Sequence, residues 1–342
     1  MSSDNVSDAL VSMIVPIYNG SSFVESFYNQ FVNQTYKKIE LIIVNDGSTD
    51  NTTDALNKYF GDMPNVKLIN KPNGGPSSAR NRGLDEATGK YVVFTDVDDV
   101  IEPDYVDYLF NLVNDNDADM SVCGYMKMNE NEKLSDFAVP EEKIYVYNQE
   151  EALVDFGYRK TIIGYSYLKL IKYDIVKDIR FCEDIYFGED YIFTYEILKK
   201  CHRVASGTRC LYSYIQCNSS STHVKKDNTL KYRKAWYKHL EVLNDSKERF
   251  KSAYIGILGK CYLLAVNDTT RISDKKKYKD FYIELLAFIK EHAKEVFADK
   301  SAGKVTRILG FAGMISPRLT CTMCKLFFGL LDRTGKSFRH TM

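Results

Sequence analysis

The chain has 342 residues, of which 44% are hydrophobic and 27% charged, as in ordinary globular proteins. It contains only 19 Gly and 7 Pro but 25 Tyr and 19 Phe, which excludes collagen-like and disordered proteins because this many aromatic residues can fill a core. The formal net charge is zero, but residues 1–120 carry 8 Lys/Arg against 19 Asp/Glu, whereas residues 221–342 carry 25 against 12. An acidic front and a basic tail indicate two tasks on one chain.

The beginning of the sequence and its cysteines bear on the compartment. The first ten residues, MSSDNVSDAL, have neither the basic nor the apolar region of a secretory signal. No run of 18 apolar residues predicts a transmembrane helix. Eight scattered cysteines in a chain without an export signal predict reduced thiols, so we expect a cytoplasmic protein.

Short β-branched runs alternate with helix-length stretches over residues 10–120. Strands are expected at 11–16, 39–44, 66–69 and 91–94, and helices at 22–34, 50–59 and 77–87. Near-continuous apolar runs are typical of strands buried on both faces. Strand, helix and strand in repeated succession predict parallel βαβ units in an open α/β sheet.

Each of these helices also has a candidate terminus. Ser21 or Ser22, Ser48 and Ser77 are the expected N-caps. Gly89 is expected to close the third helix in a left-handed conformation.

The rest of the chain reads differently. Residues 121–222 mix a short strand with polar and aromatic-rich stretches, and residues 223–342 read as helices with Lys-rich faces. The composition and charge shifts together predict a domain boundary near residue 222.

Polar residues follow each of the four expected strands. They are found at 18–20, 45–48, 70–76 and 96–99. Because ligands of open α/β sheets bind at the carboxyl ends of the strands, these four loops predict a binding site at one edge of the sheet.

Asp96, Asp98 and Asp99 place three carboxylates in four residues. Like charges this close need a cation or raised pKa values in order to coexist. Carboxylate oxygens suit Mg²⁺ or Mn²⁺, which recruit substrate phosphates. The alternative is a solvated acidic loop that caps the helix starting near Pro103.

Asp46 and Arg80 are further candidates in the same loops. Asp46 can accept a hydrogen bond from a base edge such as a uracil N–H, or it can cap the helix near Asp50. Arg80 lies one turn into the third helix, just after Gly74 and Gly75, where backbone and helix N-terminus can approach phosphate. Arg80 can therefore reach a diphosphate, with a surface salt bridge as the alternative.

Glu189 and Asp190 precede an apolar helix in the segment GEDY. They can act as a general base on an acceptor hydroxyl. They can equally stabilise the helix terminus. The local sequence does not separate the two.

Several of these segments, in their order and spacing, resemble family 2 glycosyltransferases, which have the GT-A fold. The segments are VSMIVPIYNG, QTYKKIELIIVNDGSTDNT, NKPNGGPSSARNRGLDEATGKYVVFTDVDD, FGEDYIFTYEILKK and RCLYSYIQCNSSST. The resemblance covers residues 10–222 and implies a nucleotide-sugar half at 10–120 and an acceptor half at 121–222. It implies a Rossmann-like, mostly parallel sheet with flanking helices, followed by a helical region at 223–342.

The resemblance also assigns roles to residues. It implies nucleotide contacts by Pro16, Tyr18, Asn19, Asp46, Gly74, Gly75, Arg80, Asp96 and Val97. Within these, Asp46 would bind the uracil and the two glycines with Arg80 would line the diphosphate. Asp96 and Asp98 match the family's DxD metal pair, and Asp190 matches the catalytic base. Thr95, Val97 and Pro76 depart from the commoner family residues, which puts local packing and loop stiffness in doubt.

The resemblance thus implies an inverting transferase that uses Mn²⁺ or Mg²⁺ and moves a sugar from a UDP-sugar to a glycan or lipid-linked acceptor, in cell-surface polysaccharide synthesis. The alternative is a noncatalytic nucleotide-sugar- or glycan-binding subunit that stabilises a partner transferase. A nucleotidyltransferase fits poorly because VPIYNG is not a Gly- and Arg-rich phosphate loop.

The basic tail needs its own interpretation. Residues 304–331 mix apolar side chains with Arg307, Arg318 and Lys325, and Pro317 interrupts them. Such a pattern is typical of helices on an anionic membrane surface, here the inner face of the cell membrane. A cap on the fold and a homodimer face are the alternatives. Nucleic-acid binding is not expected, because no recognition motif accompanies the charge.

Overall fold

The computed structural model describes residues 9–334 except 130–131, 133, 135–136, 138–140, 186, 217–227 and 273, with side chains up to residue 326. The chain divides into two compact units. The first comprises Met1–Gln149, Gly164–Glu183 and Phe193–His223, and the second Glu150–Ile163, Asp184–Ile192 and Val224–Met342. The boundary expected at residue 222 lies outside the described residues.

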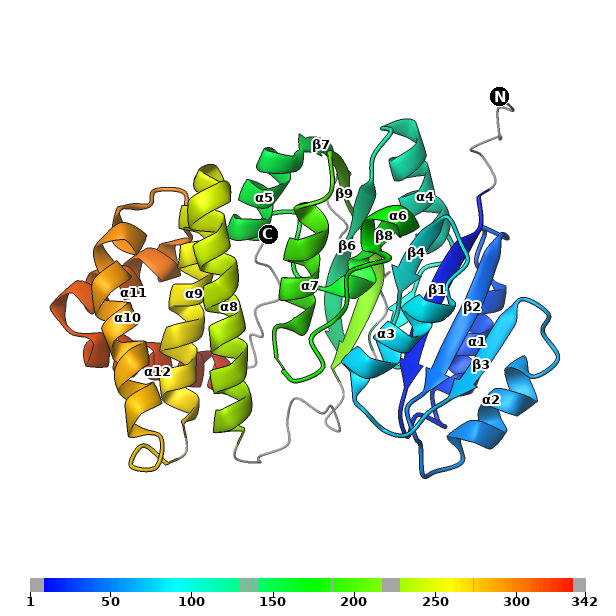
Figure 1. Cartoon of the computed structure of the whole chain (residues 1–342), viewed down its shortest axis with the longest axis horizontal. Coiled ribbons are helices and arrows are strands. Elements are labelled where there is room, and N and C mark those ends of the chain that lie inside the picture. Colours follow the sequence, from blue (N-terminus) through cyan, green and yellow to red (C-terminus); the bar gives the residue numbers. More distant parts are fainter. Residues whose placement is uncertain are drawn as a thin grey trace. The chain divides into compact units, whose positions relative to one another are not determined.

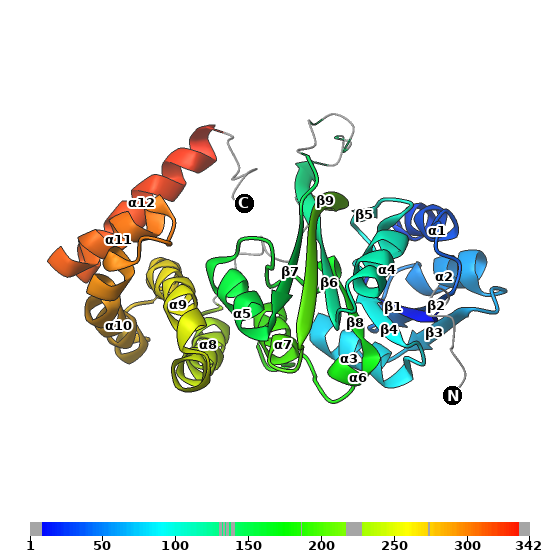
Figure 2. The ribbon, with the colours of Figure 1, turned by 90° about the horizontal axis from the view of Figure 1, so that it is seen from above.

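Four parallel strands form the first half of the sheet, as expected from the sequence. They are β1 (Val11–Ile17), β2 (Ile39–Asn45), β3 (Val66–Asn70) and β4 (Tyr91–Phe94), in the order β3-β2-β1-β4. The helices between them are α1 (Val24–Val32), α2 (Thr52–Phe60) and α3 (Pro76–Glu86). Figure 2 shows α1 and α3 on opposite faces of this sheet. Because both faces are covered, β1, β2 and β4 are almost entirely buried, which explains their apolar sequences.

The serine caps expected for these helices are wrong. The N-cap residues are Phe23, Asn51 and Gly75, and none of them makes a side-chain capping bond. Gly89 does not close α3 in a left-handed conformation, because that helix ends at Glu86. A Cβ at Gly89 would lie 2.7 Å from the Ser12 nitrogen, so the glycine permits close backbone approach instead.

A buried carboxylate joins the β1–β2 pair to the turn before β4. Glu40 on β2 accepts hydrogen bonds from Ser12 Oγ at 2.5 Å, the Thr88 nitrogen at 2.6 Å and the Gly89 nitrogen at 3.0 Å. Burial alone would raise the pKa of Glu40, but these bonds and the charge of Lys67 lower it overall. The ionised side chain therefore fixes three neighbouring backbone segments.

The second half of the sheet is mixed, as the changed sequence pattern beyond residue 120 indicates. Its strands are β5 (Val100–Ile101), β6 (Met120–Asn129), β7 (Ile144–Asn148), β8 (Lys169–Lys172) and β9 (Arg203–Gln216). The full order is β3-β2-β1-β4-β8-β6-β9-β5, with β7 also on β9 (Figure 1). Strand β8 is antiparallel to β4 and β6, and β6 is parallel to β9. The helices α4 (Tyr105–Asp115) and α6 (Tyr173–Val176) and a 3₁₀ turn at Ser166–Leu168 connect these strands.

The second unit is helical, as expected for the tail. It contains α8 (Thr229–Arg249), α9 (Lys251–Arg271), α10 (Lys279–Ala298), α11 (Lys304–Ile315) and α12 (Pro317–Thr334). Most of α5 (Gln149–Tyr158) and the first turn of α7 (Glu189–Leu198) also belong to it. The buried Trp236, Tyr262 and Phe281 lie in its core. Pro317 starts α12, which explains the interruption of the apolar tail. Over the residues described, no helix is long and apolar enough to span a bilayer.

Candidate active site

The turn after β1 is attached to the turn after β2. Asn19 adopts a φ of 48°, its nitrogen donates to Ser48 Oγ at 2.9 Å, and its side-chain oxygen accepts from the Thr49 nitrogen at 2.8 Å. Tyr18 is 52% exposed beside this junction, and Pro16 is partly buried on β1. Asn19 therefore acts on the turn, while Tyr18 presents a free aromatic surface at the carboxyl edge of the sheet.

Asp46 holds the loop that follows β3. Its carboxylate accepts from Lys71 Nζ at 2.6 Å, the Gly74 nitrogen at 2.9 Å and the Gly75 nitrogen at 2.7 Å, and the residue is 3% exposed. Asp46 does not cap the helix near Asp50, which was its alternative role. Asp50 itself bonds the start of that helix, because its Oδ1 accepts from the Thr52 nitrogen at 3.1 Å. Asp46 is thus the anchor of the glycine loop.

The two loop glycines differ in what their positions demand. Gly75 has a φ of 89° and starts α3, with open space where a Cβ would stand. A Cβ at Gly74 would lie 2.8 Å from Ser78 Oγ and 2.9 Å from Lys71 Nζ. Gly74 is exposed just before the N-terminus of α3, where anions are favoured, while the N–H groups of both glycines are bonded to Asp46.

Arg80 pairs with the first carboxylate of the acidic loop. Its Nη2 lies 2.8 Å from Asp96 Oδ1, and the exposed fractions of the two side chains are 7% and 25%. The guanidinium also lies 5.6 Å from the ring centroid of Phe181. Arg80 does form a salt bridge, as the alternative interpretation expected. The pair is largely buried, however, and does not lie on the surface. A fixed cation stands next to the acidic loop.

The three carboxylates of this loop have different surroundings. Asp99 is buried and accepts from Tyr212 Oη at 2.7 Å and from the Ile215 nitrogen at 2.9 Å, so it attaches the loop to β9. Asp98 is exposed, yet partial dehydration of its carboxyl group and the charge of Asp96 raise its pKa. Asp98 is thus the carboxylate open to a ligand, while Asp99 has a structural role.

Val97, between the two DxD carboxylates, points into the protein. It is 9% exposed, and a Cβ built at Gly20 would lie 3.5 Å from its Cγ1. The structure thus brings the Tyr18–Gly20 turn against the acidic loop. Val97 therefore contributes to packing at a position where the sequence departs from the commoner family residue.

The donor set fits a divalent cation that is shared with a phosphate ligand. Within the described part of the chain, no group of three or more His, Cys, Asp or Glu side chains is placed to hold a metal. Asp96 and Asp98 alone supply two carboxylates. Mg²⁺ is commonly held by one or two carboxylates, with substrate phosphates and water completing its octahedron.

Asp190 belongs to the second unit, in the first turn of α7 beside Glu189. The preceding Gly188 has a φ of 82° and packs directly on the ring of His239, which leaves no room for a side chain. His239 is buried; dehydration, and then the charge of Lys260, lower its pKa to about 3, so this ring is neutral. The GEDY turn is thus fixed against a rigid, uncharged surface of α8.

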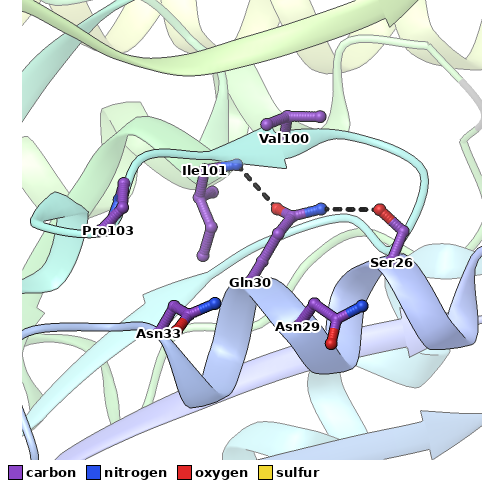
Figure 3. Close-up of a pocket in the computed structure, with 7 residues that line it drawn as sticks. All are labelled: Ser26, Asn29, Gln30, Asn33, Val100, Ile101 and Pro103. Carbon is purple, nitrogen blue, oxygen red and sulfur yellow. Dashed lines mark hydrogen bonds between the residues drawn. The ribbon is translucent and has the colours of Figure 1, made fainter.

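A separate surface pocket of about 290 Å³ lies between α1 and β5 (Figure 3). Its centre is Gln30, whose Oε1 accepts from the Ile101 nitrogen at 2.8 Å and whose Nε2 donates to the Asp99 carbonyl at 3.3 Å. Asp46, Arg80 and Asp98 are not among the pocket residues. Gln30 therefore supports the acidic loop without belonging to the site.

Two residues that support the site were not identified from the sequence. Lys71 pairs with Asp46, and Tyr212 bonds to Asp99 from a strand that is 113 residues later in the chain. Lys71 stands in a loop already singled out for its turn residues. Tyr212 lies in the segment RCLYSYIQCNSSST, which resembles the family, but nothing in the sequence assigned it a role of its own.

Comparisons with known proteins agree with this geometry. Residues 12–180 match the family model described as Glycosyl transferase family 2. Glycosyltransferase GlyA of Streptococcus pneumoniae is 32% identical over 215 residues, which cover 60% of this chain and 30% of GlyA. The uncharacterized glycosyltransferase EpsJ of Bacillus subtilis is 28% identical over 257 residues, which cover 74% of this chain and 72% of EpsJ. The chain therefore spans less than a third of GlyA but most of EpsJ.

The fold is shared with a solved structure. S. aureus TarS 1–349, crystallised in complex with UDP-GlcNAc, matches with a TM-score of 0.68 at 20% identity, over 96% of this chain and 93% of that one. The mixed α/β sheet with its strand-end loops is therefore a glycosyltransferase domain of the GT-A fold. Residues 12–180 are thus a domain of glycosyltransferase family 2.

Proposed function

We propose that the protein transfers a sugar from a UDP-sugar to a hydroxyl group of a glycan or lipid-linked acceptor, with a divalent cation and with inversion, in cell-surface polysaccharide synthesis. One observation supports the proposal most strongly. The buried Arg80–Asp96 pair lies next to the exposed Asp98 at the carboxyl edge of a parallel sheet. A fixed cation beside two carboxylates suits a ligand that carries phosphates and a metal ion. UDP-GlcNAc in the TarS complex supports the donor class.

The nucleotide would occupy the loops after β1, β2 and β3. Pro16, Tyr18 and Asn19 form the turn beside the base, with the exposed Tyr18 ring packing near it. Asp46 would accept the uracil N–H while it holds the glycine loop. Gly74, Gly75 and Arg80 would line the diphosphate, because Gly74 is exposed at the start of α3 and the guanidinium is fixed.

Asp96 and Asp98 would hold Mn²⁺ or Mg²⁺, with Asp98 as the direct ligand. Bound there, the ion neutralises charge that develops on the departing diphosphate. Arg80 adds a second positive charge to the same group.

Asp190 would take the proton of the acceptor hydroxyl. The oxygen then attacks the anomeric carbon from the face opposite the diphosphate. The new bond forms as the bond to UDP breaks, and the electron pair leaves with UDP. A single displacement of this kind inverts the anomeric configuration.

UDP release from candidate donors tests the function. We expect release from at least one of UDP-glucose, UDP-galactose and their N-acetyl forms with Mn²⁺, and its loss in excess EDTA. UDP binding without turnover of any donor, alone or with acceptors, would instead support the alternative of a noncatalytic binding subunit.

We also propose that α11 and α12 contact an anionic membrane surface. Apolar side chains on these helices are 39–64% exposed: Ile308, Phe311, Met314, Ile315, Leu319 and Leu326. Lys304, Arg318 and Lys325 are exposed on the same two helices. Apolar residues interspersed with cations fit the anionic cytoplasmic leaflet, and hence a cytoplasmic protein held peripherally at the inner face. The alternative is that a second copy of the chain covers this face in a homodimer.

A further inference from the structure

Five tyrosines form a continuous group on the second half of the sheet. They are Tyr125 on β6, Tyr165 and Tyr167 before β8, and Tyr212 and Tyr214 on β9. The ring centroids of Tyr165 and Tyr167 lie 5.2 Å apart, those of Tyr167 and Tyr212 4.2 Å, and those of Tyr167 and Tyr214 6.3 Å, with planes within 16° of parallel. Tyr125 meets Tyr165 edge to face at 5.5 Å.

The inner rings of this group bond to the acidic loop. Tyr167 and Tyr212 are 5% and 0% exposed. Tyr212 Oη donates to Asp99 Oδ2 at 2.7 Å and accepts from the Asp96 nitrogen at 3.2 Å. The stack therefore begins directly behind the DxD residues.

The outer rings reach the surface. Tyr125, Tyr165 and Tyr214 are each partly exposed. Tyr165 is held in place by the fully buried Lys169, whose Nζ donates to the Tyr165 carbonyl. Tyr125 and Tyr212 are direct partners in the parallel β6–β9 ladder, and Tyr214 follows Tyr212 on the same face. The exposed rings are thus rigidly placed.

From this arrangement we infer that Tyr125, Tyr165 and Tyr214 form a platform for a pyranose ring of the acceptor. The inference rests on the proposed function. A pyranose offers an apolar face of C–H groups edged by hydroxyls. Fixed tyrosines offer an apolar surface edged by hydroxyls, at little cost in conformational entropy.

The order of the strands decides between the donor and acceptor sugars. Asp46 follows β2 and the acidic loop follows β4, whereas the tyrosines belong to β6, β9 and the segment before β8. In the order β2-β1-β4-β8-β6-β9, the acidic loop separates the nucleotide loops from the tyrosines (Figure 1). A ligand on the tyrosines therefore faces the diphosphate site from the other side, as an acceptor must.

Saturation-transfer NMR with the full chain, UDP and Mn²⁺ tests the platform. The probes are the methyl glycosides of glucose, galactose and N-acetylglucosamine. We expect transfer to the ring C–H protons of at least one probe. Tyr165→Ala and Tyr214→Ala should each weaken its binding about two- to tenfold, the scale of one aromatic contact. Tyr165→Phe should retain it, because the ring remains.

Tyr145→Ala is the matched control. Tyr145 is 37% exposed and stacks on Tyr147 at 5.9 Å, but it pairs with Ser206, eight residues before Tyr214 on the same strand. Strand β9 is irregular between Ser206 and Cys210, and the β6 partners of Ser206 and Tyr214 are only five residues apart. At about 3.3 Å per residue these positions lie roughly 17 Å apart. We expect Tyr145→Ala to bind the probes as the wild type does.

The outcomes separate this inference from the proposed function. The platform is refuted if no probe shows transfer, if the alanine variants bind equally well, or if Tyr145→Ala has the same effect. Loss of UDP affinity in Tyr165→Ala or Tyr214→Ala also refutes it, because the tyrosines would then only support the donor site. Probe contacts that depend on the tyrosines, in a protein that turns over no UDP-sugar, would uphold the platform and refute the transferase.

Discussion

Each of the three neighbouring carboxylates has a separate role. Asp96 is paired with Arg80, Asp99 is buried under Tyr212, and Asp98 alone is exposed. Their mutual repulsion remains visible in the raised pKa values of Asp98 and Asp99, for which dehydration is the first cause and Asp96 the second. A cation bound between Asp96 and Asp98 would relieve that repulsion.

Asp98→Asn should therefore abolish most donor affinity and turnover while the fold is retained. The exposed side chain makes little contribution to packing, but losing the direct metal ligand should lower kcat on the order of 10²-fold or more. UDP release and calorimetry with UDP plus Mn²⁺ measure the two effects. Asp85→Asn, at an exposed ion pair with Arg180, is the matched control. An unchanged rate in Asp98→Asn, or full activity in EDTA, contradicts the metal assignment.

Asp190→Asn should lower kcat by about 10²–10⁴-fold, the scale of general base catalysis. UDP affinity should hardly change, since the base acts on the acceptor and not on the nucleotide. Glu189→Gln, one residue earlier in the same helical turn, is the control and should remain active. Turnover run beside UDP calorimetry decides the matter. Loss of UDP binding in Asp190→Asn would make the residue structural, and an inactive Glu189→Gln with an active Asp190→Asn would exchange the two roles.

At the scale of elements, the sequence predicted the first half of the sheet well. Each of its four strands was placed to within one residue at either end, because these strands are buried on both faces and their apolar runs are nearly continuous. The predicted helix caps were wrong because polar side chains near the helix starts bond to a neighbouring turn instead, as Asn19 does with Ser48 and Thr49. Local patterns do not contain such contacts.

The meeting of the strand-end loops was predictable for the same reason. Loops at the ends of parallel strands must meet, so Asp46, Gly75 and Asp96 could be grouped from the sequence. The role of Tyr212 depends on the long-range pairing of β5 with β9, where Ile101 is its partner. That register could not be read from either strand alone.

Glu40→Gln tests how the elements around the site are joined. It should destabilise the first unit by about 1.5–3 kcal/mol at neutral pH, the usual contribution of hydrogen bonds to a charged group. Because the folded pKa of Glu40 is lowered, this contribution is present above its unfolded pKa of about 4.3 and is lost as the pH falls through the folded value. Denaturant unfolding from pH 7 to pH 3 should show the wild type and variant converging in acid.

The control for Glu40 is Glu86→Gln. Glu86 pairs with Arg82 on the surface of α3, with side chains 34% and 45% exposed. Such pairs contribute about 0–1 kcal/mol, so this variant should unfold almost as the wild type does. Equal losses in Glu40→Gln and Glu86→Gln, or a difference that persists unchanged to pH 3, would contradict the role given to Glu40.

Across the whole molecule, charge is separated along the chain. The net charge is −11 over residues 1–120, −2 over 121–220 and +13 over 221–342. If the first unit binds a diphosphate as proposed, its acidic residues would require a cation, whereas a basic helical region attracts anionic surfaces directly. The basic tail belongs to the second unit, and the residues proposed to bind the donor belong to the first.

Co-sedimentation with lipid vesicles tests the proposed membrane face of α11 and α12. We expect the wild type to bind vesicles rich in phosphatidylserine, to bind phosphatidylcholine vesicles poorly, and to be released as the salt concentration rises. The double variant Arg318→Gln with Lys325→Gln should bind on the order of 30-fold more weakly, since each surface cation contributes about 1 kcal/mol. Ile308→Ser with Phe311→Ser should also weaken binding, because these side chains are 53% and 50% exposed and would enter the lipid interface.

Ile283→Ser on α10, at a residue that is 51% exposed, is the matched control and should bind normally. Substitutions are preferable to truncation near residue 300, which would remove the buried Leu309 and Ala312 and expose the part of the second unit that they cover. Equal binding by all variants would refute the membrane face. A dimer in sedimentation velocity that dissociates in Ile308→Ser with Phe311→Ser, together with a wild type that ignores anionic vesicles, would assign the face to a second copy of the chain.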